Sequence, residues 1–229
     1  MSRHIGIVAC SSEGAALCYR TICLEAAERM GVHDHPEVSL HTHSLAQYMR
    51  AIRADDWDAV ARLMLSSAEK LARAGADFFI CPDNTIHHGF DQVEAASPRP
   101  WLHIAREVGR EARARGHRKL GVLGTRWLME GPVYKDALEA LGLGMAIPDP
   151  DDRARMNSII FDELVCGRFE DAARARVTAM IERLRAERCD AVVLGCTEIP
   201  LLIAKEDSVL PILDSTRLLA RAALREALA

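Results

Sequence analysis

The sequence predicts an α/β protein built from two similar domains, each with a parallel four-stranded sheet flanked by helices. The first observation is that short apolar runs alternate with longer amphipathic stretches, which is the βαβα pattern of parallel sheets. The second is that strand and loop segments of the first half recur, in the same order, in the second half. We therefore expect the two domains to be related by a pseudo-two-fold axis. Of the 229 residues, 49% are hydrophobic, which is enough for a sizeable core.

The expected strands are short apolar segments separated by helical patterns. Several are continuous apolar runs, as is typical of strands that are buried on both faces of a parallel sheet. The seven expected strands are Ile5–Cys10, Val38–Thr42, Phe78–Cys81, Trp101–His103, Leu120–Leu123, Ala191–Leu194 and Val209–Leu213.

The clearest expected helix follows Asp55 and Asp56, which are plausible N-cap residues. From Trp57 to Leu71 the apolar side chains recur at helical spacing and form one face. Gly75 follows closely and is a residue type that ends helices. The other expected helices are Gly14–Met30, Ile104–Arg115, Gly131–Leu141, Asp151–Val165, Phe169–Glu187 and Ser215–Leu228.

The internal repeat consists of three strand-and-loop segments. The matched pairs are Ala76–Thr85 with Cys189–Glu198, Ile5–Cys10 with Leu120–Thr125, and Pro100–His103 with Pro211–Asp214. Any single match could reflect the general likeness of βα units, but three matches at nearly one spacing favour related halves. We predict a first domain at residues 1–99 plus 210–229 and a second at 100–209.

Composition excludes several classes of function. The formal net charge is -4, so the chain lacks the basic balance of a nucleic-acid-binding protein. No apolar run approaches the length that spans a membrane, and Ile5–Cys10 is too short for the core of a signal peptide. The seven Cys residues form no CxxC pair, which indicates free thiols in a reducing compartment. We therefore expect a cytoplasmic protein with no membrane or nucleic-acid partner.

Two polar loops follow strands at matching places in the repeat. In open α/β sheets, ligands bind beyond the carboxyl ends of the strands. Cys196 follows one strand and precedes an expected helix, whose N–H groups and dipole would favour the thiolate. The alternative is a small buried apolar residue, the usual role of Cys. Asp83 follows the matching strand and could be a base, or form an Asx turn or a helix cap. If the halves face each other, the two residues oppose one another across a cleft.

These loops resemble those of a known family. Gly195–Pro200 resembles the second catalytic loop of cofactor-independent aspartate/glutamate racemases, and Pro82–Thr85 with His87 resembles the first. The resemblance implies racemisation of an acidic amino acid in a cleft between the halves, without a cofactor, by a homodimer. It extends over essentially the whole chain, through the segments Ile5–Tyr19, Trp101–Ala105, Gly121–Tyr134 and Arg153–Leu164.

One position departs from the family pattern. The first loop of these racemases carries Cys where this chain has Asp83, so the resemblance implies Asp83 and Cys196 as the catalytic pair. A carboxylate is a weaker base than a thiolate by about 4.6 pKa units, or about 6 kcal/mol. Burial of the carboxyl group could offset about 3–5 units of this difference.

Two alternatives follow from the missing thiol. Arylmalonate decarboxylases resemble this family and keep the second-loop Cys as a proton donor, so one alternative is a one-sided decarboxylase or isomerase that uses Cys196 alone. The other is a carboxylate-binding protein without catalytic activity, whose first loop is disabled at Asp83.

The resemblance also implies residues that bind a small carboxylate substrate. Hydroxyl and N–H groups in such loops can hold an anion and the enediolate that forms from it. For Ser12, ordinary helix capping is an equal alternative. His87 is expected to support the first loop. The substrate-binding residues implied by the family are Ser11, Ser12, Asn84, Thr85, Thr125, Thr197 and Glu198.

No metal or cofactor site is predicted. The close His pairs, such as His41 with His43, lack a third ligand at a spacing typical of zinc sites. The nucleotide-binding pattern GxxxxGK[ST] does not occur, and none of the four Lys residues follows a strand as a pyridoxal Schiff base would require. Arg50 and Arg53 are interpreted as solvated helix charges, with a clamp for a distal carboxylate as the alternative.

Overall fold

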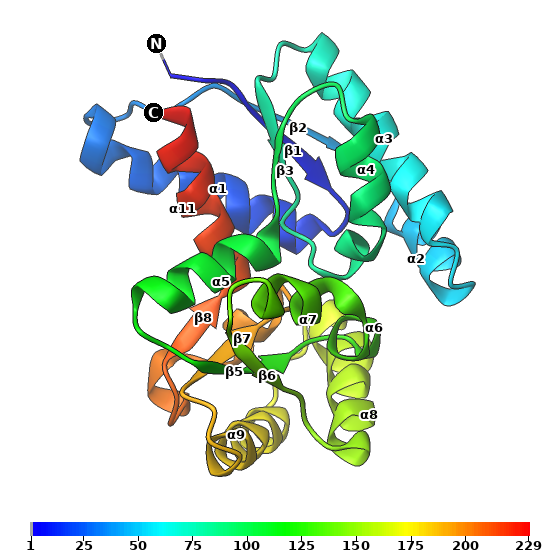
Figure 1. The fold of residues 1–229 in the computed structure, drawn as a ribbon, viewed down its shortest axis with the longest axis vertical. Helices are drawn as coiled ribbons and strands as arrows, with labels where there is room; N and C mark the ends of the chain where they lie inside the picture. Colours follow the sequence, from blue (N-terminus) through cyan, green and yellow to red (C-terminus); the bar gives the residue numbers. More distant parts are fainter. Residues whose placement is uncertain (1) are drawn as a thin grey trace. The chain divides into compact units, whose positions relative to one another are not determined.

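The computed structural model describes residues 2–229 and divides them into two compact units (Figure 1). The first unit comprises the chain up to Ile104 together with Thr216–Ala229, and the second comprises Ala105–Ser215. These boundaries lie five to six residues later in the chain than the sequence predicts. The reason is strand pairing, because Trp101–Leu102 pairs with the first sheet and Ile212–Asp214 with the second.

Each unit contains one parallel four-stranded sheet, and the two sheets have equivalent strand orders. The order is β2-β1-β3-β4 in the first unit and β6-β5-β7-β8 in the second. This confirms the predicted fold class of two parallel four-stranded sheets flanked by helices. The strands are β1 (Ile5–Ala9), β2 (Val38–Thr42), β3 (Phe78–Ile80), β4 (Trp101–Leu102), β5 (Lys119–Leu123), β6 (Gly144–Ala146), β7 (Ala191–Leu194) and β8 (Ile212–Asp214).

Helices cover both faces of the first sheet (Figure 1). Because side chains alternate along a strand, Ile5 and Ile7 point to one face, where they pack with Ile22 and Leu219 from two helices. The other face is covered by a helix that contacts β1 and β2. In order, the helices of this unit are α1 (Ser12–Met30), α2 (Leu45–Arg53), α3 (Trp57–Arg73), the 3₁₀ turn η1 (Thr85–Gly89), α4 (Phe90–Ala96) and α11 (Ser215–Ala227).

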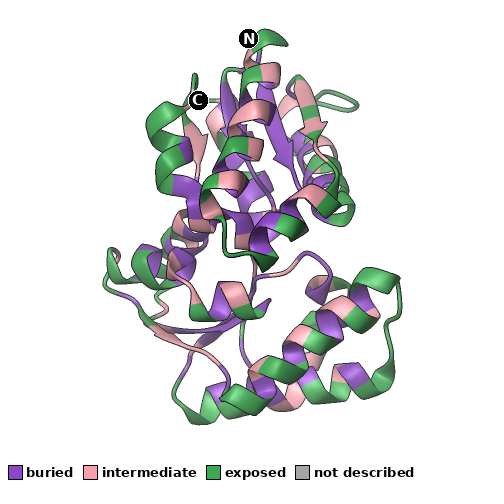
Figure 2. Ribbon diagram, turned by 90° about the vertical axis from the view of Figure 1, so that its right-hand side faces the viewer, coloured by how far each residue is buried: buried purple, intermediate pink, exposed green. Residues whose placement is uncertain are grey.

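The second unit buries its sheet in the same manner. Val192 and Leu194 of β7 pack with Val177 and Ile181 in one apolar cluster. The central strands β5 and β7 are buried, while the outer helix faces are exposed (Figure 2). The helices are α5 (Ile104–Ala114), α6 (Arg126–Glu130), α7 (Pro132–Glu139), α8 (Pro150–Ser158), the π-helical turn η2 (Ile159–Glu163), the 3₁₀ turn η3 (Leu164–Cys166), α9 (Asp171–Ala186), α10 (Ile199–Leu202) and the 3₁₀ turn η4 (Lys205–Asp207).

The last strand and the start of α3 differ in detail from the expected elements. The last strand begins at Ile212, because Ser208–Leu210 form a turn in which the Ser208 side chain bonds the backbone of Leu210. At the start of α3, Asp56 is the N-cap and accepts from the Ala59 N–H at 2.8 Å. Asp55 instead accepts from the indole N–H of Trp57.

Candidate functional site

The first polar loop is fixed by bonds to the Asp83 carboxylate. The backbone N–H of Cys10 donates to Oδ2 and that of Ser11 to Oδ1, both at 3.0 Å. These donors lie in the loop after β1, next to β3 in the sheet, while the chain continues from β1 to β2 on the other side. Asp83 therefore lies at the point where the strand order reverses, which is the usual ligand-binding edge of such sheets. Two backbone donors stabilise the charged form of a carboxylate.

His87 connects this loop to the start of α5 through hydrogen bonds of its ring. Its Nδ1 lies 2.9 Å from the carbonyl oxygen of Asp83, and its Nε2 lies 3.5 Å from the backbone N of Ile104. A carbonyl oxygen accepts and a backbone N–H donates, so both bonds require a neutral ring with its proton on Nδ1. His87 is 3% exposed, so its role is to position the loop rather than to contact solvent.

Cys81 does not serve as the missing thiol of the first loop. Its side chain is fully buried, and its Sγ donates to the carbonyl oxygen of Asp83 at 3.7 Å. Burial, and after it the charge of Asp83, raises the pKa of Cys81 well above the ordinary value. Burial also raises the pKa of Tyr48, whose neighbours include Cys81 and Asp83. Both groups stay protonated at neutral pH, so Asp83 is the acceptor in this loop.

The second polar loop requires glycine at two positions. The backbone N–H of Gly195 donates to the carbonyl of Leu123 at 2.7 Å, which joins the loops after β5 and β7. A Cβ at Gly195 would lie 2.9 Å from that carbonyl oxygen and 2.6 Å from Cδ2 of Leu128. A Cβ at Gly124 would lie 3.2 Å from the carbonyl oxygen of Gly195. Backbone contact between the loops therefore fixes the position of the next residue, Cys196.

Cys196 is held by a carboxylate. Its thiol donates to Oε2 of Glu198 at 2.9 Å, and the hydroxyl of Thr197 donates to the same oxygen at 2.7 Å. Glu198 is 5% exposed. The sequence led us to expect a helix N-terminus that favours the thiolate, but α10 starts at Ile199 and has four residues. The nearby negative charge instead favours a thiol that keeps its proton.

The hydroxyls expected to bind substrate divide into two groups. Ser11 and Thr125 are N-caps: Ser11 Oγ accepts from the Gly14 N–H at 3.2 Å, and Thr125 Oγ1 accepts from the Leu128 N–H at 3.3 Å. Ser12 is exposed on the first turn of α1. Asn84 and Thr197 are buried beside the two loop residues, and Thr85 opens η1.

Known proteins resemble this chain in sequence and in fold. A model of the Asp/Glu/Hydantoin racemase family matches residues 7–223. The chain belongs to this family. A candidate Asp/Glu racemase from Yersinia pestis is 31% identical, with a TM-score of 0.92 over 99% of this chain and 100% of that one. An aspartate racemase homologue from Pyrococcus horikoshii is 27% identical, with a TM-score of 0.86 over 100% of both chains.

A third relative of this racemase-family chain is characterised by its activity. A broad specificity amino-acid racemase from Bacillus subtilis is 25% identical over 199 residues, which are 86% of this chain and 84% of that protein. The resemblance inferred from the sequence is therefore confirmed at the level of the family. Racemases are isomerases, so the family is one of enzymes.

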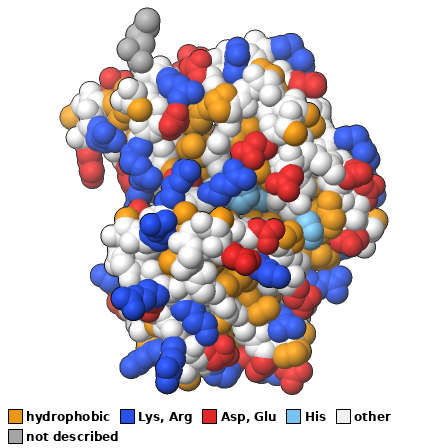
Figure 3. All heavy atoms as spheres, in the orientation of Figure 1, with side chains coloured by type: hydrophobic (Ala, Val, Ile, Leu, Met, Phe, Trp, Pro, Cys, Tyr) orange, Lys and Arg blue, Asp and Glu red, His pale blue; other side chains and the backbone are white. Residues whose placement is uncertain are grey.

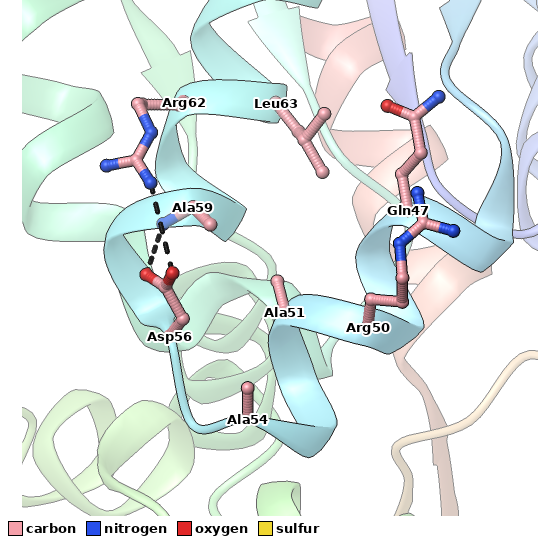
Figure 4. A pocket seen from close by; sticks show the side chains of 8 residues that line it. All are labelled: Gln47, Arg50, Ala51, Ala54, Asp56, Ala59, Arg62 and Leu63. Atoms are coloured by element: carbon pink, nitrogen blue, oxygen red, sulfur yellow. Dashed lines mark hydrogen bonds and ion pairs between the residues drawn. The ribbon is translucent and has the colours of Figure 1, made fainter.

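Two pockets lie in the first unit of this racemase-family chain. The larger has a volume of about 710 Å³, and its lining includes Cys10 and Ser11, whose backbone N–H groups bind Asp83. The smaller, about 440 Å³, lies between α2 and α3 and carries Arg50 and Arg62 (Figure 4). Its lining within residues 2–229 includes none of the site residues predicted from the sequence. The larger pocket had no signal in the sequence, because its walls come from two stretches, within residues 9–19 and 38–45, that only the fold brings together.

Figure 3 shows acidic and basic side chains interspersed over the visible face rather than gathered in one basic area. Among residues 2–229, no three His, Cys, Asp or Glu side chains are grouped as metal ligands would be. No helix in that range is long and apolar enough to cross a bilayer.

Proposed function

We propose that this protein is a cofactor-independent amino-acid racemase in which Asp83 and Cys196 move the proton at the α-carbon. The observation that carries the proposal is the equivalence of their positions. Each follows the strand next to the first strand of its sheet, at the point where the strand order reverses. The carboxyl ends of these strands are where such folds bind ligands.

The chemistry assigned to the pair is general acid–base catalysis. Racemisation requires a proton to leave one face of the α-carbon and another to arrive at the opposite face. Asp83 is a proton acceptor whose carboxylate accepts hydrogen bonds from two N–H groups. Cys196 is a thiol that donates a hydrogen bond to Glu198. In one direction Asp83 accepts the α-proton and Cys196 protonates the enediolate, and in the other direction the roles exchange.

A second candidate is a one-sided reaction in which Cys196 alone donates a proton, as in a decarboxylase. The observation that favours it is the pair of hydrogen bonds from Cys10 and Ser11 to Asp83. Hydrogen bonds to a charged carboxylate stabilise it and so make it a weaker base. The two candidates predict different deuterium incorporation in D₂O. A racemase incorporates deuterium into both enantiomers of the substrate, and a one-sided enzyme into one.

The finer assignments also belong to the proposal. The family name makes aspartate and glutamate the first substrates to test, and we propose a homodimer that acts in the cytoplasm. All seven Cys residues are free thiols, which supports a reducing compartment. Light scattering on the purified protein measures the oligomeric state.

The experiment is deuterium exchange at the α-carbon. The protein is incubated in D₂O with each enantiomer of aspartate, glutamate, alanine and leucine, and separately with an arylmalonate. NMR then reports the α-proton and carbon loss, and chiral chromatography reports the opposite enantiomer. We expect deuterium in both enantiomers together with racemisation. Decarboxylation of the arylmalonate, or α-deuterium exchange in only one enantiomer of an amino acid, would support the one-sided reaction. Absence of exchange from every substrate would overturn both.

A further inference from the structure

The larger pocket of the first unit shares a wall with the proposed catalytic loop. It is about 710 Å³ and lies between the start of α1 and the end of β2. Cys10 and Ser11 line it, and their backbone N–H groups hold the Asp83 carboxylate at 3.0 Å. The pocket therefore borders the two residues that fix the position of the Asp83 carboxylate. Ligand pockets of small molecules have volumes of about 300–1,000 Å³.

The lining of this pocket is mostly apolar, and its polar members are Ser11, Ser12, Thr42, His43 and Ser44. Large apolar side chains from three segments contribute, namely Tyr19 from α1, Leu40 from β2 and Leu45 from the start of α2. Among the described residues that line it, none is Lys, Arg, Asp or Glu. His43 also lines it, and burial, followed by the charge of Lys70, lowers the pKa of His43 below its ordinary value of 6.5. His43 is therefore neutral at pH 7, and the pocket offers no cation to a carboxylate.

Apolar surface in this pocket remains in contact with water. Tyr19 and Leu40 are each 45% exposed, and Leu45 is 38% exposed. Covering such surface with an apolar group is favourable in proportion to the area removed from water. Contiguous exposed apolar side chains commonly mark binding sites.

An acidic side chain fits this position poorly. A second carboxylate would lose its hydration against apolar walls and would also be repelled by the Asp83 carboxylate. The pocket that carries Arg50 and Arg62 is lined by a different set of residues and shares none with this one. In it, Asp56 already lies 3.9 Å from Arg62 (Figure 4).

We propose that this apolar pocket is the side-chain subsite of the enzyme, and that its preferred substrates are α-amino acids with apolar side chains. Aliphatic and aromatic side chains both fit the chemistry of the lining. The proposal rests on the proposed racemase function, and it replaces aspartate and glutamate as the preferred substrates.

The first test compares kcat/KM for α-deuterium exchange among alanine, leucine, phenylalanine, aspartate and glutamate. One methylene in an apolar pocket changes kcat/KM by roughly 10–200-fold. We expect leucine and phenylalanine to exceed aspartate and glutamate by at least about 10-fold on this basis. Faster exchange of aspartate and glutamate than of leucine and phenylalanine would leave the racemase function intact and overturn the subsite.

Variants of α1 locate the subsite. Ala16 is an exposed residue of α1 that lines the pocket, so Ala16→Trp fills the pocket without disturbing the core. We expect the ratio of kcat/KM for phenylalanine over alanine to fall about 10-fold or more. Ala27→Trp places the same side chain on an exposed position of the same helix, away from the pocket, and should leave the ratio unchanged.

A charge-introducing variant makes the specificity test independent of size. Leu45→Arg places a cation at the pocket, and we expect the ratio of aspartate over leucine to rise by at least about 10-fold, since the change pairs a charge that was previously unpaired. An unchanged ratio would overturn the subsite.

A change of oligomeric state in Ala16→Trp, with unchanged substrate preference, would also overturn it and identify the pocket as a surface for a second copy of the chain. If no amino acid exchanges at all, the racemase function itself fails.

Discussion

The two polar loops occupy equivalent positions in sheets of the same strand order, yet their chemistry is opposite. In the first loop, the carboxylate of Asp83 accepts from two backbone N–H groups. In the second, the thiol of Cys196 donates to the carboxylate of Glu198. The repeated topology therefore fixes where a functional side chain lies, and the local hydrogen bonds decide whether it accepts or donates a proton.

This difference gives the proposed pair a defined resting state. Asp83 is held in the charged form by its donors, while Cys196 is held as a thiol by its acceptor. In the proposed mechanism, the resting protein would match the enantiomer whose α-proton faces a carboxylate. After one proposed turnover both protons would have moved, and the pair would match the other enantiomer. The asymmetry affects rates of the two half-reactions but not the equilibrium, which is one between mirror images.

The largest expected effect comes from removing the proton-transfer groups. Asp83→Asn keeps the size and an acceptor oxygen, and Cys196→Ser keeps a hydroxyl donor of much higher pKa. We expect each to lower α-deuterium exchange by about 10²–10⁴-fold, since this is the usual contribution of a general acid or base. NMR in D₂O measures the rates for both enantiomers.

Matched controls for these variants lie close by. Cys81→Ser changes a buried thiol two residues from Asp83, and Cys166→Ser changes an exposed thiol in the second unit. Neither residue is part of the proposed pair. Asp83→Asn could instead retain α-deuterium exchange in both enantiomers, at rates within about threefold of those of the unchanged protein. Asp83 would then not be the base, and the difference between the two loops would have no role in catalysis.

The sequence predicted the fold well where strands have a clear pattern. Val38–Thr42 and Ala191–Leu194 form strands with the predicted bounds, because both segments are rich in β-branched or other apolar residues. The strand β6 was not predicted, since Gly144–Ala146 has three residues and no β-branched side chain. The nine-residue helix α2 was also missed, because it spans little more than two turns of pattern.

The sequence predicted that Asp83 and Cys196 follow equivalent strands, but it did not predict the interactions of these two residues. The repeat located Asp83 and Cys196 because strand ends of duplicated units carry equivalent loops. The groups that bind Asp83 are backbone N–H groups, which every residue except proline carries and which leave no mark in a sequence. Glu198 was expected to bind substrate, and its bond to the Cys196 thiol depends on the path of the loop.

A second prediction compares the stability that the two loops provide. In Asp83→Ala, the N–H groups of buried Cys10 and half-buried Ser11 lose their acceptor. We expect a loss near the lower end of the about 1–3 kcal/mol that a fully buried unpaired group costs. Cys196→Ala removes one side chain of intermediate exposure, and we expect a loss below about 1 kcal/mol. Urea unfolding measures both. Equal losses in the two variants would show that the loops are held with similar strength, contrary to the hydrogen-bond pattern.

A third prediction concerns the reactivity of Cys196. Its thiol lies 2.9 Å from the Glu198 carboxylate, and a like charge disfavours the thiolate. We expect Glu198→Gln to speed alkylation of Cys196 at pH 7 by roughly 10-fold, because loss of the neighbouring charge enlarges the fraction of reactive thiolate. Mass spectrometry with a Cys166→Ser background measures the rate, since Cys166 is exposed and would otherwise react. Slower alkylation of Cys196 in Glu198→Gln would show that Glu198 activates the thiol as a base.

The smallest expected effect is a difference in acid sensitivity between the two units. In the first unit, His41 on β2 contacts Ser67 at 2.9 Å and Lys70 at 3.1 Å, and His43 lies beside it. Burial, and after it the charge of Lys70, lowers the pKa of both His41 and His43 below 6.5. The corresponding strand of the second unit, Gly144–Ala146, carries no titratable side chain.

The sign of this effect follows from proton linkage. Below pH 6.5 the unfolded chain binds protons at these His residues that the folded chain does not, so folded stability falls as pH decreases. We therefore expect amides of the first unit to lose hydrogen-exchange protection between pH 6.5 and 5, before those of the second unit. His41→Gln should reduce this loss, because Gln keeps hydrogen-bonding groups but does not titrate. Equal loss in both units, unchanged in His41→Gln, would place the acid-sensitive groups elsewhere.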